Sequence, residues 1–512
     1  MKYRCVKSSS ANWSKKFNDL IYIDKDITEK NITSYKELFE HLIDGISFDT
    51  FISEIFEKTP CYFMRETNDT NNLVDILSCK SFLKIIKTDF NDHIIPNNNI
   101  TAVRYIDDER DDLDWFDIVS SKKRKAQDED IYVSSKDIDK AFSQLYTLQF
   151  YQPQRFLDHL HKINSSFEYH FGTLAGSSAY LTPSPSQGLP PHHDDVDVFI
   201  LQTEGEKLWY IWNGDEELPD NYARIEREKL PSQCQEILLR KGDMLYLPRG
   251  TIHEAIAKDS FSTHVTISIY QHYNMKTLLL RALPLALNKA FEQDISIRKG
   301  LPIRFSDTFG SFASKNLETG QKLVMDYPQA ILSRENFLQK CQSIVNSLTD
   351  FVTIDTIDQA ADEVVMDFVE NRLPPPLSLN NNLNNKSKGK LKISGASKVR
   401  LIDPNIMQCT IQEVDGVSLL CVFNALYNNR LSHMGHPLDV DEDEDEDEDE
   451  PNEPFLVSFP ARLSPIICSL IQAYPNYSKV TDIANIVSLC QISAGEVNDT
   501  IQTLNQYHFI DS

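Results

Sequence analysis

The spacing of apolar and polar residues changes several times along the chain. In residues 35–43 and 48–56 apolar side chains recur at positions i, i+3 and i+4, which predicts amphipathic helices. From residue 167 to residue 271 the period is two, in short β-branched and aromatic runs separated by Gly and Pro, a pattern typical of a β-barrel or β-sandwich. Helical spacing returns across residues 275–372.

Polar segments separate and interrupt these regions. Residues 106–139 are rich in charged residues, so we expect a long exposed loop there. Three consecutive prolines at 374–376 end the second helical region, and the Asn-, Ser- and Lys-rich stretch after them is typical of a linker. The predicted organisation is an N-terminal tail at residues 1–34, a β domain with preceding helices at 35–275, a helical domain at 276–377, a linker at 378–398 and a small α+β domain at 399–512.

The charge of the chain is concentrated in one block. The 512 residues include 51 Lys and Arg against 76 Asp and Glu, a formal net charge of −25. Residues 439–453 contribute twelve acids and no base, and the rest of the chain carries −13. So acidic a chain is a poor non-specific ligand for nucleic acid. We expect the block to be a disordered insertion in the C-terminal domain that attracts basic partners.

Cysteine usage and hydropathy narrow the setting of the protein. The nine cysteines are scattered and form no CxxC pair, which favours a reducing compartment over a disulfide framework or a thiolate zinc site. We expect no secretory signal in residues 1–19, because they contain no continuous apolar stretch. The most apolar helical stretch, residues 278–290, contains Arg281, Pro284 and Lys289 and is too short to span a bilayer, so we expect no membrane association.

The candidate chemistry lies in the β-patterned region. The sequence GLPPHHDDVDVF at residues 188–199 contains His192 and Asp194, which share one face of an extended strand because side chains alternate. The sequence GDMLYLPRGTIH at residues 242–253 ends in His253, just after an apolar strand and a turn. Two His and one carboxylate on one face make the facial triad of non-haem Fe(II) oxygenases, which leaves three coordination positions open. The alternative is a pair of solvated loop histidines.

A buried cation is expected close to this triad. Residues 198–212 read as a hairpin that turns at Glu204 and Gly205, and Lys207 alternates with large apolar residues on its second strand. An inward lysine is costly unless it is paired, and the distal carboxylate of a 2-oxoglutarate cosubstrate would be a natural partner. The alternative is an edge-strand lysine whose ammonium group reaches water.

A second polar strand face lies after His253. In residues 262–271, His264, Thr266 and Ser268 share one face of the expected strand, and the opposite face is apolar. Ser268 could donate a hydrogen bond to cosubstrate or substrate from that polar face. The alternation alone fits a solvent-facing side of the strand equally well.

Taken together, these segments resemble the JmjC ribosomal oxygenases. Their sequences are most similar to the Mina type, ribosomal oxygenase 2. The match is strongest across residues 145–275. The segments that carry it are QFxQPQRF at 149–156, GxLxGS at 172–177, GLPPHxDDV at 188–196, LQxEGEKxW at 201–209, PRGTIH at 248–253 and STHVTISxYQ at 262–271.

The resemblance implies roles for individual residues. It implies iron binding by His192, Asp194 and His253, cosubstrate binding by Lys207, Tyr180 and Ser268, and substrate contacts by Tyr180, Ser178, Gln152 and Ser268. Ser178 departs from the family pattern, which usually has Asn at this position. The shorter hydroxyl would lose amide contacts and could alter substrate positioning.

The resemblance also implies a fold and a reaction. The fold would be α+β, with a JmjC double-stranded β-helix of the cupin-like jelly-roll type, a helical dimerisation domain and a C-terminal winged helix. The reaction would use Fe(II), 2-oxoglutarate and O₂ to hydroxylate the β-carbon of a histidine in a large-subunit ribosomal protein, with release of succinate and CO₂.

Two other functions stay open at this point. A histone lysine demethylase could use the same site, and would be expected to surround the methylammonium group with aromatic side chains. A non-catalytic acidic protein of ribosome assembly or chromatin could keep a degenerate oxygenase fold, although the intact triad and Lys207 argue against that alternative.

The expected setting is nuclear and nucleolar, with roles in ribosome biogenesis or in chromatin and transcription regulation. The basic run KKRK at residues 122–125 is either an import signal or a solvated charge run. A homodimer is expected from the resemblance and from the helical region, whose apolar positions need burial. Histones are further candidate partners. Nucleic-acid contact through the winged helix rests on analogy of fold alone.

Overall fold

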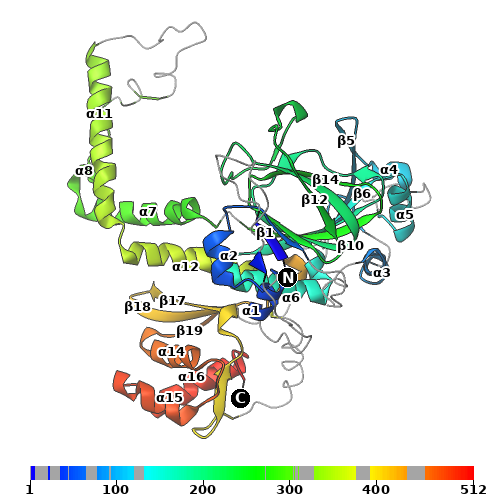
Figure 1. Ribbon diagram of the computed structural model, residues 1–512. Helices are drawn as coiled ribbons and strands as arrows, with labels where there is room; N and C mark the ends of the chain where they lie inside the picture. Colours follow the sequence, from blue (N-terminus) through cyan, green and yellow to red (C-terminus); the bar gives the residue numbers. More distant parts are fainter. Residues whose placement is uncertain are drawn as a thin grey trace. The chain divides into compact units, whose positions relative to one another are not determined.

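The computed structural model describes residues 2–5, 21–22, 35–43, 45–64, 78–90, 94–119, 132–270, 273–303, 305, 309–310, 328–375, 392–434 and 456–511 (Figure 1). The basic run at residues 122–125, the acidic block at 439–453 and most of the expected tail and linker lie outside these ranges. In the part of the chain that is described, no helix is long and apolar enough to cross a membrane. The chain divides into two compact units, of which the first contains Met1–His272 and Phe368–Ser512 and the second contains Tyr273–Asp367.

The first unit contains a curled, antiparallel sheet. Hydrogen bonds connect its strands in the order β2-β1-β3-β13-β10-β15-β7-β6-β4-β5, and the remaining strands, β8, β9, β11, β12 and β14, continue the sheet on a second side. This arrangement confirms the β structure predicted from the spacing in residues 167–271. The strands are β1 (Lys2–Cys5), β2 (Ile21–Tyr22), β3 (Cys61–Met64), β4 (Ile100–Ile106), β5 (Glu109–Asp112), β6 (Thr147–Tyr151), β7 (Ala175–Thr182), β8 (Ser186–Gln187), β9 (His192–His193), β10 (Asp197–Trp212), β11 (Ala223–Arg224), β12 (Gln235–Arg240), β13 (Met244–Leu247), β14 (Ile252–Ala257) and β15 (Ser262–Ile269).

Strand β10 joins the two sides of the sheet. Its first half pairs with β13 and β15, and its second half pairs with β12 and β14. The predicted hairpin at Glu204 and Gly205 is wrong, because β10 runs straight through these residues. The register against β15 shifts between Gln202 and Glu204, and Gly205 has a φ of 61°. A glycine in this conformation makes a bulge, which bends a strand without reversing it.

Helices cover the sheet and close an aromatic core. The predicted helices at residues 35–43 and 48–56 are confirmed. The ring of Phe39 on α1 lies 5.0 Å from Phe167 on α6, and Phe167 lies 4.8 Å from Phe199 on β10. The helices before and within the β domain are α1 (Tyr35–Leu42), α2 (Phe48–Glu54), α3 (Cys79–Thr88), α4 (Trp115–Ile118), α5 (Ser135–Ser143) and α6 (Asp158–Phe171).

The prediction of a long exposed loop at residues 106–139 is wrong for the described part of that segment. Strands β4 and β5 form a hairpin there, and helices α4 and α5 follow. A few residues stabilise these elements. Trp115 and Ile118 are buried, and Arg104 pairs with Asp111 at 2.7 Å. The segment was predicted as a loop because its many charged residues outnumber the few residues that stabilise the strands and helices.

The second unit is helical, as the spacing predicts. Its helices are α7 (Met275–Gln293), α8 (Ile295–Arg298), α11 (Pro328–Ser347) and most of α12 (Ile354–Asn371). The α7 helix has two apolar faces. Ala282, Ala286 and Ala290 are buried, whereas Leu283 and Leu287 are among several large apolar residues exposed along the same helix.

The C-terminal part of the first unit contains strands and helices together, as expected of an α+β domain. Strands β17, β18 and β19 form one sheet, and β20, β16 and β21 form another beside three helices. A winged-helix architecture stays a prediction. The elements are β16 (Lys398–Leu401), β17 (Met407–Val414), β18 (Val417–Asn424), β19 (Leu456–Pro460), α14 (Ser464–Ala473), β20 (Ser478–Lys479), α15 (Val480–Val487), α16 (Ala494–Gln506) and β21 (Ile510–Asp511).

A buried carboxylate connects this C-terminal part to helix α6 within the first unit. Glu168 Oε1 accepts a hydrogen bond from His433 Nε2 at 2.8 Å, and Oε2 accepts from the backbone N–H of Leu373 at 3.0 Å and lies 4.0 Å from Arg372 Nε. His433 Nδ1 accepts from Gln154 Nε2 at 3.0 Å, so one neutral tautomer of His433 satisfies both contacts. Glu168, Arg372 and His433 are all buried.

Replacing Glu168 by Leu should lower the free energy of unfolding by about 3–5 kcal/mol, because the Arg372 guanidinium would lose its carboxylate inside the protein. Urea denaturation of the two proteins measures this difference. The matched control is Glu226→Gln, which breaks an exposed pair with Lys229 and should change the free energy of unfolding much less, because water screens that pair. Equal losses in the two variants would contradict the assigned role of Glu168.

Candidate metal centre and cosubstrate cavity

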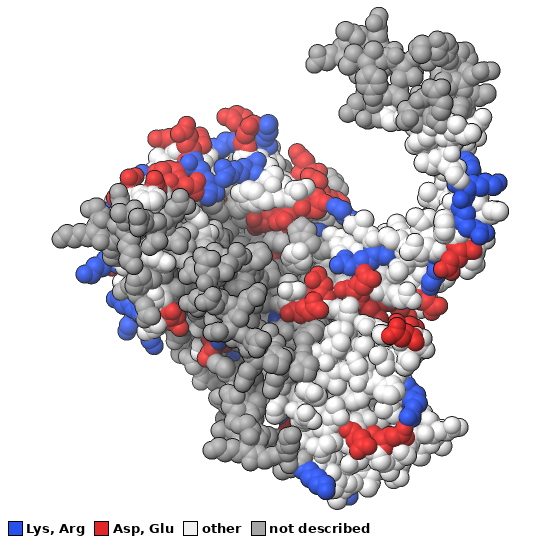
Figure 2. All heavy atoms as spheres, turned by 180° about the vertical axis from the view of Figure 1, so that it is seen from behind, with Lys and Arg blue, Asp and Glu red and all other residues white. Residues whose placement is uncertain are grey.

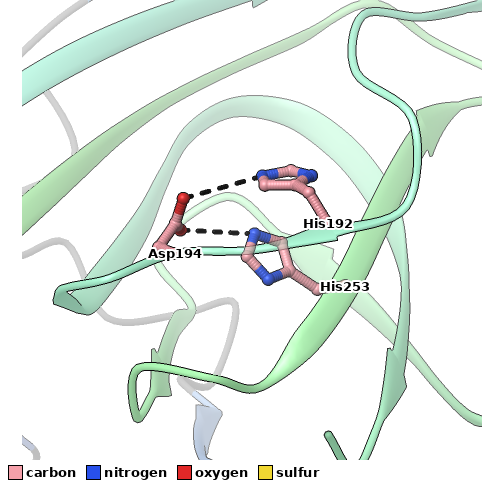
Figure 3. Close-up of side chains that lie close together, drawn as sticks. All are labelled: His192, Asp194 and His253. Atoms are coloured by element: carbon pink, nitrogen blue, oxygen red, sulfur yellow. Dashed lines mark ion pairs between the residues drawn. The ribbon is translucent and has the colours of Figure 1, made fainter. Parts of the chain in front are cut away.

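Backbone pairing brings the three candidate ligands together. His192 on β9 lies directly opposite His253 on β14, and Asp194 follows directly after the end of β9. The Nε2 atoms of His192 and His253 lie 3.8 Å and 3.6 Å from the Asp194 carboxylate oxygens (Figure 3). One ligand atom from each of the three residues lies within 4.8 Å of the other two, as a shared metal ion requires.

The tautomers of both histidines are fixed by the backbone. Nδ1 of His192 lies 2.8 Å from the carbonyl oxygen of Pro190, and Nδ1 of His253 lies 2.9 Å from that of Thr251. A carbonyl oxygen only accepts, so each Nδ1 carries the proton and each Nε2 presents a lone pair toward Asp194. This arrangement orients the imidazole rings as metal ligands are usually oriented.

The protonation state of the centre also suits a cation. Burial and, to a smaller extent, the neighbouring His253 lower the pKa of His192 to about 4, although Asp194 opposes the shift. A neutral imidazole at physiological pH is free to bind a metal ion. Two imidazole nitrogens and one carboxylate oxygen fit Fe(II), and no other group of this kind occurs among the described residues.

A cavity of about 260 Å³ opens beside the triad. Tyr180 and Lys207, two of the predicted cosubstrate residues, line it together with the triad. Lys207 is buried, as the strand alternation predicts, and its ammonium group donates to Thr182 Oγ1 at 3.0 Å. Burial lowers the pKa of Lys207 to about 7, so an anionic ligand in the cavity would stabilise its charged form.

The other predicted site residues do not line this cavity. Gln152 has a φ of 51°, and its side-chain oxygen accepts from the backbone N–H of Ser177 at 3.3 Å and from Gln154 Nε2 at 2.7 Å. The side-chain oxygen of Gln152 is therefore used in hydrogen bonds within the protein. Ser178 and Ser268 are also absent from the described cavity wall. Substrate contacts by Gln152, Ser178 and Ser268 therefore stay predictions.

Two residues that line the cavity were not predicted from the sequence. Gln149 on β6 donates to the hydroxyl of Tyr180 at 2.9 Å and lines the cavity. The sequence signal was available, because Gln149 opens the same motif that contains Gln152. Arg110 lines the cavity from β5, inside a segment that reads as a charged loop.

A second arginine fixes the hairpin that carries Arg110. The guanidinium of Arg227 donates to both oxygens of Glu254 at 3.1 and 2.9 Å, and it also pairs with Asp108 at the tip of the β4–β5 hairpin. Glu254 is buried beside His253 and lines the cavity. The Arg227 contacts thus tie the hairpin to the strand that carries a candidate metal ligand.

A family model described as JmjC domain matches residues 149–278. This chain therefore contains a JmjC domain. Mouse ribosomal oxygenase 2 is 30% identical over 348 residues, which cover 67% of this chain and 66% of that protein. The resemblance to the JmjC ribosomal oxygenases is therefore confirmed. The chain spans less than two thirds of the length of the first relatives that it matches.

Other relatives of this JmjC chain extend the comparison. The bifunctional lysine-specific demethylase and histidyl-hydroxylase NO66 of Drosophila persimilis is 28% identical over 469 residues, which cover 89% of this chain and 60% of that protein. Among solved structures, Escherichia coli YcfD aligns with 91% of this chain and 98% of its own at a TM-score of 0.40 and 12% identity.

The stability of the metal-free JmjC protein should rise with pH from about 7 to about 10.5. In this window Lys207 is neutral in the folded chain and still protonated in the unfolded chain, so the unfolded state binds more protons. Relative to Lys207→Met, wild type should gain up to about 1.4 kcal/mol per pH unit. Urea denaturation at several pH values measures the difference, and parallel curves would contradict the burial effect.

Proposed function

We propose that this JmjC protein is an Fe(II)- and 2-oxoglutarate-dependent protein oxygenase. The observation that carries the proposal is the meeting of two sites in one cavity, the triad of His192, Asp194 and His253 and the buried ammonium group of Lys207. Bound Fe(II) would supply the activation of O₂, coupled to the conversion of 2-oxoglutarate into succinate and CO₂.

The residues of the chain would bind and orient the reactants. Lys207 would hold the distal carboxylate of 2-oxoglutarate, while the Pro190 and Thr251 carbonyls keep the two histidines in the ligating tautomer. Tyr180, fixed by Gln149, would form a wall of the cavity where cosubstrate and substrate meet. The buried surroundings would exclude bulk water from the reacting groups.

The proposed reaction is hydroxylation of the β-carbon of a histidine in a large-subunit ribosomal protein. The names of the relatives support this assignment, since they include ribosomal oxygenases and a histidyl-hydroxylase. Location in the nucleus and nucleolus belongs to the same proposal. Histones stay alternative substrates.

Lysine demethylation is the second candidate, because aromatic residues line the cavity. Tyr151, Tyr180 and Tyr222 could surround a methylammonium group. Arg110 lines the same cavity, but its guanidinium is paired with Asp112 at 2.5 Å, and the carboxylate of Glu254 also lines the cavity. The charges of the wall therefore leave both substrates open, and product analysis decides between them.

Nucleic-acid contact receives little support from the C-terminal helices. Helices α15 and α16 contain Asp482, Glu496 and Asp499 and no Lys or Arg. On the face shown in Figure 2, the basic side chains of the described residues are interspersed with acidic ones rather than gathered in one patch. Binding to phosphates requires a concentration of basic residues.

The test of the function is product analysis with Fe(II), 2-oxoglutarate and two sets of peptides. Histidine-containing ribosomal peptides should gain the mass of one oxygen atom while succinate accumulates. Formaldehyde release from methylated histone peptides would instead support demethylation. Failure to bind metal and to turn over either set would favour a non-catalytic protein.

Variants of the triad test the site assignment in the same assay. His192→Ala and Asp194→Ala should reduce succinate formation to background and abolish Mn(II) binding measured by calorimetry, because each removes one of three ligands. His193→Asn is the matched control, since His193 is adjacent on β9 and outside the ligand group. Unchanged turnover in either alanine variant would refute the assignment.

Homodimerisation through the helical unit is also proposed. The exposed residues Leu280, Leu283, Leu287 and Phe291 are spaced three and four residues apart, so they form one apolar face of α7. An exposed apolar face of this extent is typical of a protein–protein interface.

The charged double variant Leu283→Asp with Leu287→Asp should convert a dimer into a monomer, as measured by light scattering coupled to gel filtration. Two carboxylates on the apolar face would have to be buried without partners in the dimer. Asn288→Asp adds a charge at a neighbouring exposed position and should leave the dimer intact. A monomeric wild type would refute the proposal.

A further inference from the structure

Two polar side-chain atoms of residues that line the cavity have no hydrogen-bond partner among the described residues. They are Nδ1 of His264 on β15 and Nε1 of Trp209 on β10. Both side chains are almost completely buried, and both line the cavity beside Lys207. Burying a donor or acceptor without a partner is unfavourable, so such atoms on residues of a cavity wall point to a ligand that completes them.

Packing fixes the position of the His264 ring. It stacks on Tyr180 with ring centroids 4.8 Å apart and an angle of 8° between the planes, and Trp209 packs edge-on at 5.5 Å. The ammonium group of Lys207 lies 5.9 Å from the centre of the Trp209 ring. The three side chains therefore surround one small region of the cavity.

The charge of this region selects the ligand. Burial and the nearby Lys207 both hold the pKa of His264 well below its usual range, so the imidazole is neutral and can donate one hydrogen bond. The Trp209 indole can only donate. One cation and two neutral N–H groups match the several lone pairs of a carboxylate.

We propose that His264 and Trp209 act with Lys207 as neutral hydrogen-bond donors to the distal carboxylate of the 2-oxo dicarboxylate cosubstrate. This inference rests on the proposed function and deepens it, because it adds two residues to the cosubstrate site. Lys207 supplies the positive charge, and hydrogen bonds from the two aromatic N–H groups fix the orientation of the carboxylate. The cavity then favours a dicarboxylate over a 2-oxo acid that lacks the second carboxylate.

The experiment measures binding of 2-oxoglutarate to Mn(II)-loaded protein by calorimetry without O₂. His264→Leu should weaken binding about tenfold or more, the effect of losing a hydrogen bond to a charged group. His264→Gln keeps an amide donor and should restore most of the affinity. Affinity for Mn(II) should stay at the wild-type value in both variants.

A second variant keeps the proposal testable if His264→Leu does not fold. Trp209→Phe removes the indole N–H, keeps an aromatic ring, and should also weaken 2-oxoglutarate binding about tenfold. The control is His170→Gln, a change at a partly buried histidine that lies on α6 outside the described cavity wall. It should bind 2-oxoglutarate as wild type does.

The outcomes separate the inference from the function on which it rests. If wild type binds 2-oxoglutarate and His264→Leu binds it equally well, the inference is overturned and the proposed function stands. Equal losses in His264→Leu and His264→Gln also overturn it, because ring packing rather than hydrogen bonding would then explain the effect. If Mn(II)-loaded wild type fails to bind 2-oxoglutarate, the proposed function fails and the inference fails with it.

Discussion

The cavity depends on the hydrogen bonding of strand β10, which is shared between the two sides of the curled sheet. The bulge at Gln202 and Glu204 lets one strand change partners from β13 and β15 to β12 and β14. Gly205 makes the bend possible, because a Cβ atom there would lie 1.8 Å from the carbonyl oxygen of Phe261. The bend in β10 carries Lys207 and Trp209 to the wall that faces the triad.

A second constraint supports the opposite wall from outside the β domain. The buried Glu168 and His433 hold Gln154, and Gln154 in turn donates to Gln152. Gln152 accepts from the backbone of Ser177 on β7, the strand that carries Tyr180. A continuous chain of hydrogen bonds therefore runs from the C-terminal part of the first unit to a strand of the cavity. The C-terminal part contributes to the order of the cavity without reaching the metal centre.

The sequence is most informative where function depends on local alternation. The i, i+2 spacing of His192 and Asp194 predicts their common face, and the alternation around Lys207 predicts its burial. Both patterns need only the geometry of one strand. The position of His253 opposite His192 required more, namely the pairing of β14 with β9, which the motif spacing suggested and the structure describes.

Contacts between distant segments were beyond the sequence pattern. Gln149 reaches Tyr180 through the pairing of β6 with β7, and Arg110 reaches the cavity because Arg227 anchors a hairpin that resembles a loop in composition. The hairpin predicted at Gly205 failed for a related reason. A glycine between two apolar runs fits both a turn and a bulge, and only the partners of the strand decide between them.

The charges around the cavity limit which groups can hold the cosubstrate. Lys207 and Asp194 carry opposite charges, and Fe(II) with a 2-oxoglutarate dianion would add none overall. Arg110 and Glu254, which also line the cavity, carry opposite charges as well, so the loaded cavity would stay close to neutral in surroundings where burial strengthens electrostatic interactions. A second protonated donor in place of neutral His264 would upset this balance and repel Lys207. Neutral donors at His264 and Trp209 therefore hold a carboxylate without adding charge to the cavity.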